Sequence, residues 1–118
     1  MSERPCLYLV VRGDLSPGRQ VAQAVHAARQ FAEAHPETER EWFESSNTLA
    51  VLSVPDVEAL LAIRCRAEIL GLRFSLFREP DLRDEPTALA LEPSRFSRRL
   101  CHNLRLALSQ ADSRCTDT

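Results

Sequence analysis

The first third of the chain constrains the fold most strongly. Residues 6–11 (CLYLVV) are a continuous apolar run rich in strand-forming residues, bounded by Pro5 and Gly13. An apolar run of this length without alternation is typical of a strand buried on both faces. A loop over 12–18 follows, and apolar residues then recur at helical spacing. They are Val21, Ala24, Val25, Ala28, Phe31 and Ala32. A buried strand that leads into an amphipathic helix predicts an α/β fold.

The remaining segments extend this unit. We expect a short surface helix over 37–45, whose aromatic pair Trp42-Phe43 packs back on the core, and a buried strand over 49–54. A helix capped by Asp56 and strands over 73–79 and 87–91 follow. Ser94 then begins a final helix, expected to bury Phe96, Leu100, Leu104 and Leu108.

This order, β-α-(α)-β-α-β-β-α, predicts a single-domain three-layer sandwich in which helices flank a mixed four-stranded sheet. Strands joined through helices favour parallel pairing, and the short connection between the last two strands permits an antiparallel hairpin. With 118 residues, one core is expected. We assign residues 1–108 to the domain and residues 109–118 to a disordered tail, because the tail has nothing to bury.

Composition excludes several classes of function. All 15 basic residues are Arg, so no lysine nucleophile or Schiff base is available. The net charge of −2 provides no global positive field, and nucleic-acid binding would need a local patch. Four cysteines and three histidines are widely scattered, which does not favour a metal site, and Cys6 and Cys65 are expected in the core. We predict no cofactor.

The same reading bears on location. No apolar run approaches the roughly 20 residues of a spanning helix, and residues 1–5 lack the features of a signal peptide. The sequence therefore predicts a cytoplasmic protein with no membrane partner.

Two polar stripes are candidate functional surfaces. Arg19, Gln23, His26 and Gln30 recur along the first helix, beside a loop over 12–19 that is placed to hold an anion. This stripe either faces water or borders a site. The final helix carries a dense positive face, which is either solvated or contacts a phosphodiester backbone. Its members are Arg95, Arg98, Arg99, His102 and Arg105.

Several motifs carry a family resemblance. Residues 7–15 (LYLVVRGDL), Gly18-Arg19 and residues 21–28 (VAQAVHAA) resemble the N-terminal signature of the archaeal/eukaryotic-type peptidyl-tRNA hydrolases (the Pth2 family). That signature is a strand, an R-x-D-L loop, then G-K and A-A-Q-x-x-H-A-A on a helix. Further similarities keep the family order over nearly the whole chain, at residues 54–56 (VPD), 70–72 (LGL), 75–76 (SL) and 87–91 (TALAL).

The chain also departs from the family pattern. Arg19 stands where the family has a catalytic Lys, and Val25 replaces a Ser. The family's active-site Asp falls on Glu79 in a shorter loop, with Asp81 as the other candidate. With these differences, the chain resembles a divergent bacterial branch of the family.

The resemblance implies hydrolysis of the ester between a peptide and the 3′-ribose of tRNA, without a metal or an organic cofactor. Its implied catalytic residues are Arg19, His26, Glu79 or Asp81, and Thr87. The implied substrate contacts are Arg12, Asp14, Gln23, Arg95, Arg98 and Arg99.

The implied partner is tRNA and not DNA, and a homodimer is left open. The alternatives are a non-catalytic module that binds tRNA or protein on the same fold, and a small-molecule domain that uses the first loop as an anion site.

Overall fold

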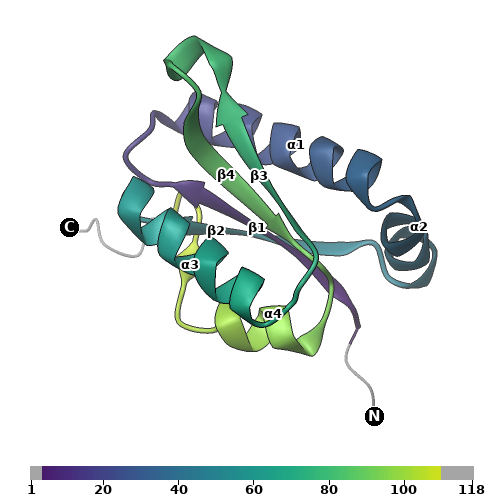
Figure 1. Ribbon diagram of the computed structural model, residues 1–118. Helices are drawn as coiled ribbons and strands as arrows, with labels where there is room; N and C mark the ends of the chain where they lie inside the picture. The colour runs from purple at the N-terminus through teal and green to yellow at the C-terminus, as the bar shows by residue number, and fades with distance from the viewer. Residues whose placement is uncertain (1–3, 110–118) are drawn as a thin grey trace.

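The computed structural model of the protein describes residues 4–109. Within that range one mixed sheet has the strand order β3-β4-β1-β2-β5 (Figure 1). Strands β1 and β2 are parallel, and β4 runs antiparallel to both β1 and β3. The strands are β1 (Cys6–Arg12), β2 (Thr48–Val54), β3 (Phe74–Glu79), β4 (Glu85–Leu91) and β5 (Arg105–Leu106).

Helices cover both faces of this sheet. On one face α1 packs against β1, β4 and β3 and contacts α2, and on the other face α3 and α4 pack together (Figure 1). The three-layer α/β architecture expected from the sequence is confirmed. The helices are α1 (Pro17–Ala34), α2 (Pro36–Ser45), α3 (Val57–Ile69) and α4 (Arg95–Leu100). No helix in the described range is long and apolar enough to cross a membrane.

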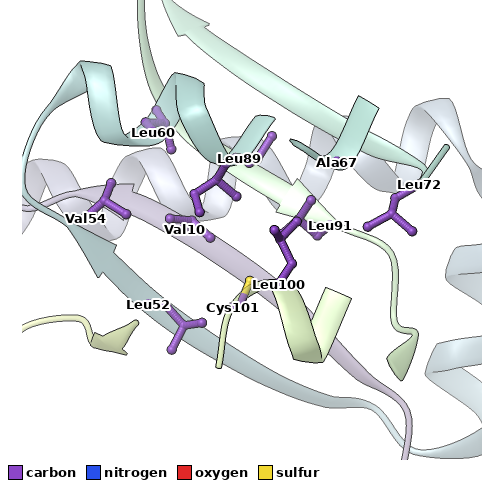
Figure 2. Packing of buried hydrophobic residues seen from close by; sticks show 11 residues of the cluster. Val10, Leu52, Val54, Leu60, Ala67, Leu72, Leu89, Leu91, Leu100 and Cys101 are labelled. Atoms are coloured by element: carbon purple, nitrogen blue, oxygen red, sulfur yellow. The ribbon is translucent and has the colours of Figure 1, made fainter. Parts of the chain in front are cut away.

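The central strand β1 separates two apolar cores. Leu7, Leu9 and Val11 pack on the α1 side, whereas Val10 lies in the cluster formed with α3 and α4 (Figure 2). A strand buried on both faces needs apolar residues at every position, which explains the continuous run at residues 6–11. Each fully buried Leu or Val contributes about 1.5–3 kcal/mol to the stability of the sheet.

The sequence did not predict the fifth strand. The prediction of a four-stranded sheet is wrong because the final helix ends at Leu100, and the chain then turns back along β2. Leu106 pairs with Leu52, and the amide of Ala107 donates to the carbonyl of Val51 at 2.8 Å. Because the chain leaves the helix after Leu100, it can pair with part of the backbone N–H and C=O groups at the edge of β2. A longer final helix would have left those groups unpaired by this segment.

Only part of the apolar set expected in the final helix is buried. Leu100 is buried and Leu104 is partly buried against the same core, but Phe96 and Leu108 are exposed.

Of the predicted aromatic pair in α2, Trp42 is buried and donates its ring N–H to the carbonyl of Thr48 at 2.6 Å, whereas Phe43 is exposed.

The predicted core also differs at two further places. Cys65 is exposed and not in the core, and Cys6 is only partly buried. Residues 110–118 of the predicted disordered tail lie outside the described residues.

The buried face of α1 differs from the predicted one. Val21 and Val25 have relative exposures of 54% and 51%, while Gln23 is only 4% exposed. Ala24 and Ala27 are buried on the same face as Gln23, and their small side chains let the helix lie close to the sheet. The helix is therefore rotated so that a polar residue enters the core.

Candidate active site

Buried polar side chains join three elements at one end of the sheet. The hydroxyl of Thr87 on β4 donates to Oε1 of Gln23 on α1 at 2.6 Å. The amide nitrogen of Gln23 in turn donates to Oε1 of Glu79 at 2.7 Å. Because Thr87 is fully buried and Gln23 nearly so, this chain of hydrogen bonds fixes the carboxylate of Glu79 from behind.

A β-bulge aims Thr87 at α1. Phe77 pairs with Ala88 whereas Arg78 pairs with Pro86, so Thr87 is an extra residue on β4. A bulge redirects the side chain of its extra residue and is often found beside functional sites. Thr87 thereby reaches Gln23 from a strand whose neighbouring positions supply the apolar cores.

The carboxylate of Glu79 is held in its ionised form. The hydrogen bond from Gln23 is the largest influence that lowers its pKa from the ordinary value, and the backbone N–H of Asp81, 3.1 Å from Oε2, is the next. The charges of His26 and Arg19 lower the pKa further. Glu79 therefore lies within electrostatic reach of both residues.

Arg19 and His26 are exposed on α1. They lie four residues before and three residues after the buried Gln23, so the three side chains follow one side of the helix. The imidazole of His26 stacks on Phe77 of β3, with ring centroids 4.7 Å apart and an interplanar angle of 18°. Farther along the helix, the side-chain amide of Gln30 donates to the carbonyl of Leu76 at 3.0 Å. The predicted polar stripe thus follows the edge strand β3 and is not simply solvated.

The structure distinguishes the two acidic candidates. Glu79 accepts hydrogen bonds from Gln23 and from the turn that follows it. Asp81 is exposed in the 3₁₀ turn Pro80–Leu82, and its backbone N–H is the group that contacts Glu79. Glu79 is therefore the carboxylate that the fold brings to Arg19 and His26.

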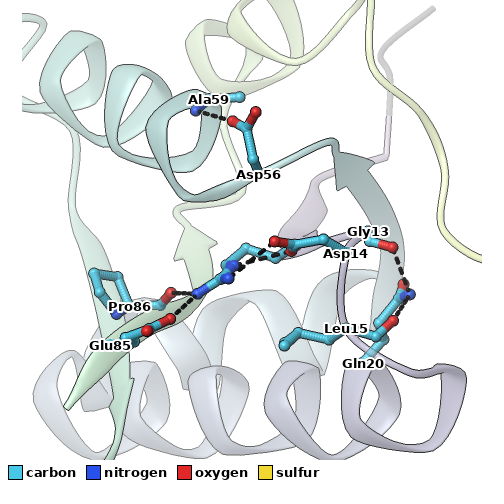
Figure 3. A network of polar contacts seen from close by, with 9 residues as sticks. Gly13, Asp14, Leu15, Gln20, Asp56, Ala59, Glu85 and Pro86 are labelled. Carbon is cyan, nitrogen blue, oxygen red and sulfur yellow. Dashed lines mark hydrogen bonds and ion pairs between the residues drawn. The ribbon is translucent and has the colours of Figure 1, made fainter. Parts of the chain in front are cut away.

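Arg12 belongs to a separate network at the same end of the sheet. Its guanidinium donates twice to Asp14 at 3.0 Å, and also to Glu85 at 2.7 Å and the carbonyl of Pro86 at 3.1 Å (Figure 3). Arg12 is buried, and these contacts engage most of its donors. The geometry does not fit the expected phosphate contact and instead ties the loop after β1 to the start of β4.

The loop between β1 and α1 is also fixed by its backbone. The amide of Gly13 donates to the carbonyl of Val54 at 2.7 Å, and a Cβ at position 13 would lie 2.8 Å from the hydroxyl of Ser53. The side chain of Gln20 donates to the carbonyl of Leu15 at 2.7 Å (Figure 3). This loop holds the first turn of α1, and with it Arg19, in a defined position.

The arginines of the final helix are not part of this cluster. Arg95, Arg98 and Arg99 follow the carboxyl end of β4 and line a groove with Cys6 and Tyr8, near the beginning of β1. Glu79 and Arg12 lie at the other end of the sheet. The structure therefore divides the predicted site residues into two groups.

Three features of this end of the sheet are not predicted by the sequence. They are the stacking of Phe77 on His26, the ion pair of Glu85 with Arg12, and the bulge at Thr87. A Pro inside a strand is a sequence signal for a bulge, and Pro86 directly precedes Thr87.

Together the first group can act on an electrophilic carbonyl. A carboxylate, an imidazole and a guanidinium near one another can orient water, accept its proton and stabilise an oxyanion. Among residues 4–109 no group of three His, Cys, Asp or Glu side chains is placed to hold a metal ion.

Comparison with solved structures supports the class of fold. A protein of unknown function from Agrobacterium tumefaciens aligns with a TM-score of 0.67, covering 89% of this chain and 98% of that one. The sequences are only 14% identical, so this similarity concerns the three-layer α/β fold alone.

Sequence comparison establishes the family. The family model described as "Peptidyl-tRNA hydrolase PTH2" matches residues 6–106, and the chain belongs to this family. Proteins named "Peptidyl-tRNA hydrolase 2, mitochondrial" from Homo sapiens and Bos taurus are each 35% identical over 79 residues. The aligned segment covers 62% of this chain and 44% of each relative, so the match spans less than half the length of those proteins.

Proposed function

We propose that this protein is a peptidyl-tRNA hydrolase, which cleaves the ester between a peptide and the 3′-ribose of tRNA. Membership of the family supports the reaction class. The observation that carries the proposal is the hydrogen-bonded chain from Thr87 through Gln23 to Glu79, within electrostatic reach of Arg19 and His26. It provides a fixed carboxylate beside two side chains that can handle protons and negative charge.

In the proposed reaction, Glu79 and His26 orient a water molecule toward the ester carbonyl. The water oxygen attacks the carbonyl carbon and loses a proton to His26, while Arg19 stabilises the negative charge that develops on the carbonyl oxygen. Collapse of the intermediate breaks the bond to the ribose oxygen, which takes the proton from His26. The products are a peptide acid and tRNA with a free 3′-hydroxyl.

The roles of Glu79 and His26 follow from their surroundings. A carboxylate whose pKa is lowered is a weak base, so Glu79 serves better to orient water and to stabilise a positive charge on His26. Stacking on Phe77 holds the imidazole in one orientation. Thr87 and Gln23 are positioning residues that act through Glu79, while Asp14 orders the loop through Arg12.

The test is turnover of N-acetyl-aminoacyl-tRNA, with free aminoacyl-tRNA as the control substrate. The proposal expects hydrolysis of the blocked ester and much slower hydrolysis of the unblocked one. Binding of tRNA without turnover of either ester would contradict it and would favour the non-catalytic module. Equal cleavage of both esters would contradict specificity for peptidyl-tRNA.

A further inference from the structure

A basic groove of about 840 Å³ lies beside α4, outside the proposed active site. The described residues that line it include four arginines and a histidine but no carboxylate. These lining residues are Arg4, Pro5, Cys6, Tyr8, Pro93, Ser94, Arg95, Arg98, Arg99 and His102. In a chain with a net charge of −2, this is a strong local concentration of positive charge.

The groove and the proposed active site lie at opposite ends of the sheet. Tyr8 near the start of β1 pairs with Leu91 at the end of β4, whereas Glu79 pairs with Glu85 where β4 begins. Seven residues of strand span roughly 20 Å. Tyr8 also packs against the core on the α3 and α4 side, away from α1. A small substrate cannot contact both places, but a macromolecule can.

The uncharged groups of the groove do not weaken its positive field. Burial raises the pKa of Tyr8 to about 12, with a further contribution from Cys6. Burial likewise raises the pKa of the Cys6 thiol and that of the adjacent Cys101 thiol, the latter to about 12. At neutral pH these groups are a phenol and two thiols, so they bring no negative charge, and the phenol can donate a hydrogen bond.

The arrangement of the cations fits a phosphate backbone better than a compact ligand. Arg95, Arg98 and Arg99 are exposed along α4, and Arg4 reaches the groove from the segment before β1, anchored by a 2.8 Å hydrogen bond to the carbonyl of Ser46. Sites for small phosphates usually converge on a ring of backbone N–H groups. Arginines spread along an open surface are typical of contacts to successive phosphates of a nucleic acid.

We propose that this groove binds the phosphate backbone of tRNA, at a second contact distant from the ester. The inference rests on the proposed function, because the occupant is taken to be the RNA part of the same substrate. The protein would then contact its substrate at two places: one end of the sheet binds the ester, and the other binds the body of the RNA through its shape and charge.

The first test measures binding without chemistry. The double variant Arg95→Gln/Arg99→Gln removes two exposed groove charges, and Arg40→Gln/Arg66→Gln removes two exposed arginines from α2 and α3 as the matched control. The affinity for uncharged tRNA is measured by filter binding over a range of salt concentrations. We expect the groove variant to bind more weakly and to flatten the salt slope by about one unit per lost contact. Equal slopes for the groove and control variants would overturn the proposal.

The second test compares two ester substrates of different size. Wild type and both variants are assayed on N-acetyl-aminoacyl-tRNA and on the same ester carried by a short 3′ oligonucleotide. For the groove variant, kcat/KM should fall about tenfold more on the tRNA than on the oligonucleotide, because only the tRNA reaches the groove. Equal losses on the two substrates would contradict a distant contact.

Two further outcomes separate the proposals. If a mononucleotide displaces tRNA from the wild type at the concentration at which it binds the groove, the site takes a small ligand and the RNA assignment is wrong. If the wild type cleaves neither ester, the proposed function fails, and the salt dependence of tRNA binding still decides whether the groove binds RNA.

Discussion

Two polar networks occupy the same end of the sheet and are built in opposite ways. In one, the buried Arg12 gives its donors to Asp14, Glu85 and a backbone carbonyl. In the other, the buried Gln23 and Thr87 hold Glu79, whose carboxylate interacts electrostatically with the exposed Arg19 and His26. In the first network the charged group is buried, and its contacts within the protein engage most of its hydrogen-bond donors. In the second network the buried groups are uncharged, and the charged groups are nearer the surface.

This difference separates structure from chemistry. A saturated buried cation joins segments of the chain, and its loss is expected to affect folding. A carboxylate fixed from behind by uncharged partners keeps lone pairs for a substrate, and its neighbours should affect turnover more than stability. The predictions below test this division, starting with the largest expected effect.

Arg19→Ala should reduce single-turnover hydrolysis of N-acetyl-aminoacyl-tRNA by roughly 10²–10³, the usual cost of removing one donor to an oxyanion. Arg19→Lys keeps the charge and should retain substantial activity. The affinity for tRNA should change little in either variant. An Ala variant as active as the wild type would show that Arg19 is a surface residue and that the proposed mechanism is wrong.

Arg12→Met should lower the free energy of unfolding by about 2 kcal/mol, as expected when hydrogen bonds to charged groups are lost. The cost stays moderate because Asp14 and Glu85 are partly exposed and can be hydrated again. Urea denaturation measures the change, with Arg19→Ala as the comparison, which should remain within about 0.5 kcal/mol of the wild type. If both variants are equally stable, the two networks do not differ as described.

Gln23→Leu should raise the pKa of Glu79, because it removes the hydrogen bond that lowers this pKa most. We expect about a tenfold loss of activity, because the carboxylate that orients the water is no longer held in place. NMR titration of ¹³C-labelled glutamate measures the pKa directly. Gln30→Leu is the control, because it removes a contact to a backbone carbonyl about two helical turns from Gln23. A Glu79 pKa that does not change in Gln23→Leu would refute the positioning role.

The smallest expected effect is on the pH dependence of stability. The ion pair with Arg12 lowers the pKa of Asp14 below its ordinary value of 3.8. The stabilisation is therefore fully present above the unfolded-state pKa and is lost as the pH falls through the folded-state pKa. As the pH falls below the ordinary Asp pKa, the free energy of unfolding should fall less steeply in Arg12→Met than in the wild type. Parallel curves would mean that Asp14 does not depend on Arg12.

Regular elements could be predicted from the sequence because their patterns are local. The apolar run at residues 6–11 indicated a strand buried on both faces, and the short connection between β3 and β4 permitted the hairpin that the structure contains. The stripe of Arg19, Gln23 and His26 was visible as helical spacing. The family resemblance, confirmed by the match over residues 6–106, added the carboxylate at Glu79.

The differences have a common physical origin in tertiary partners. Hydrophobicity alone assigns Gln23 to the surface and Val21 to the core, but the hydroxyl of Thr87 and the carboxylate of Glu79 satisfy the amide and allow it to be buried. The final helix was predicted too long because its apolar spacing continues past Leu100, whereas pairing with β2 is a distant interaction. No local pattern reveals which segment will cover the edge of a sheet.

The two-residue strand β5 has a consequence for how the protein behaves at high concentration. Unpaired strand edges are templates for intermolecular pairing, and the β2 edge carries the exposed Leu49 near its start. Arg105 and Leu106 pair with Ser53 and Leu52 in the second half of β2, so two copies cannot join their sheets into a continuous one there. A chain cut before Arg105 would retain most of both cores but would present a longer adhesive edge. The loss of β5 should therefore be detected first as self-association and fibre growth.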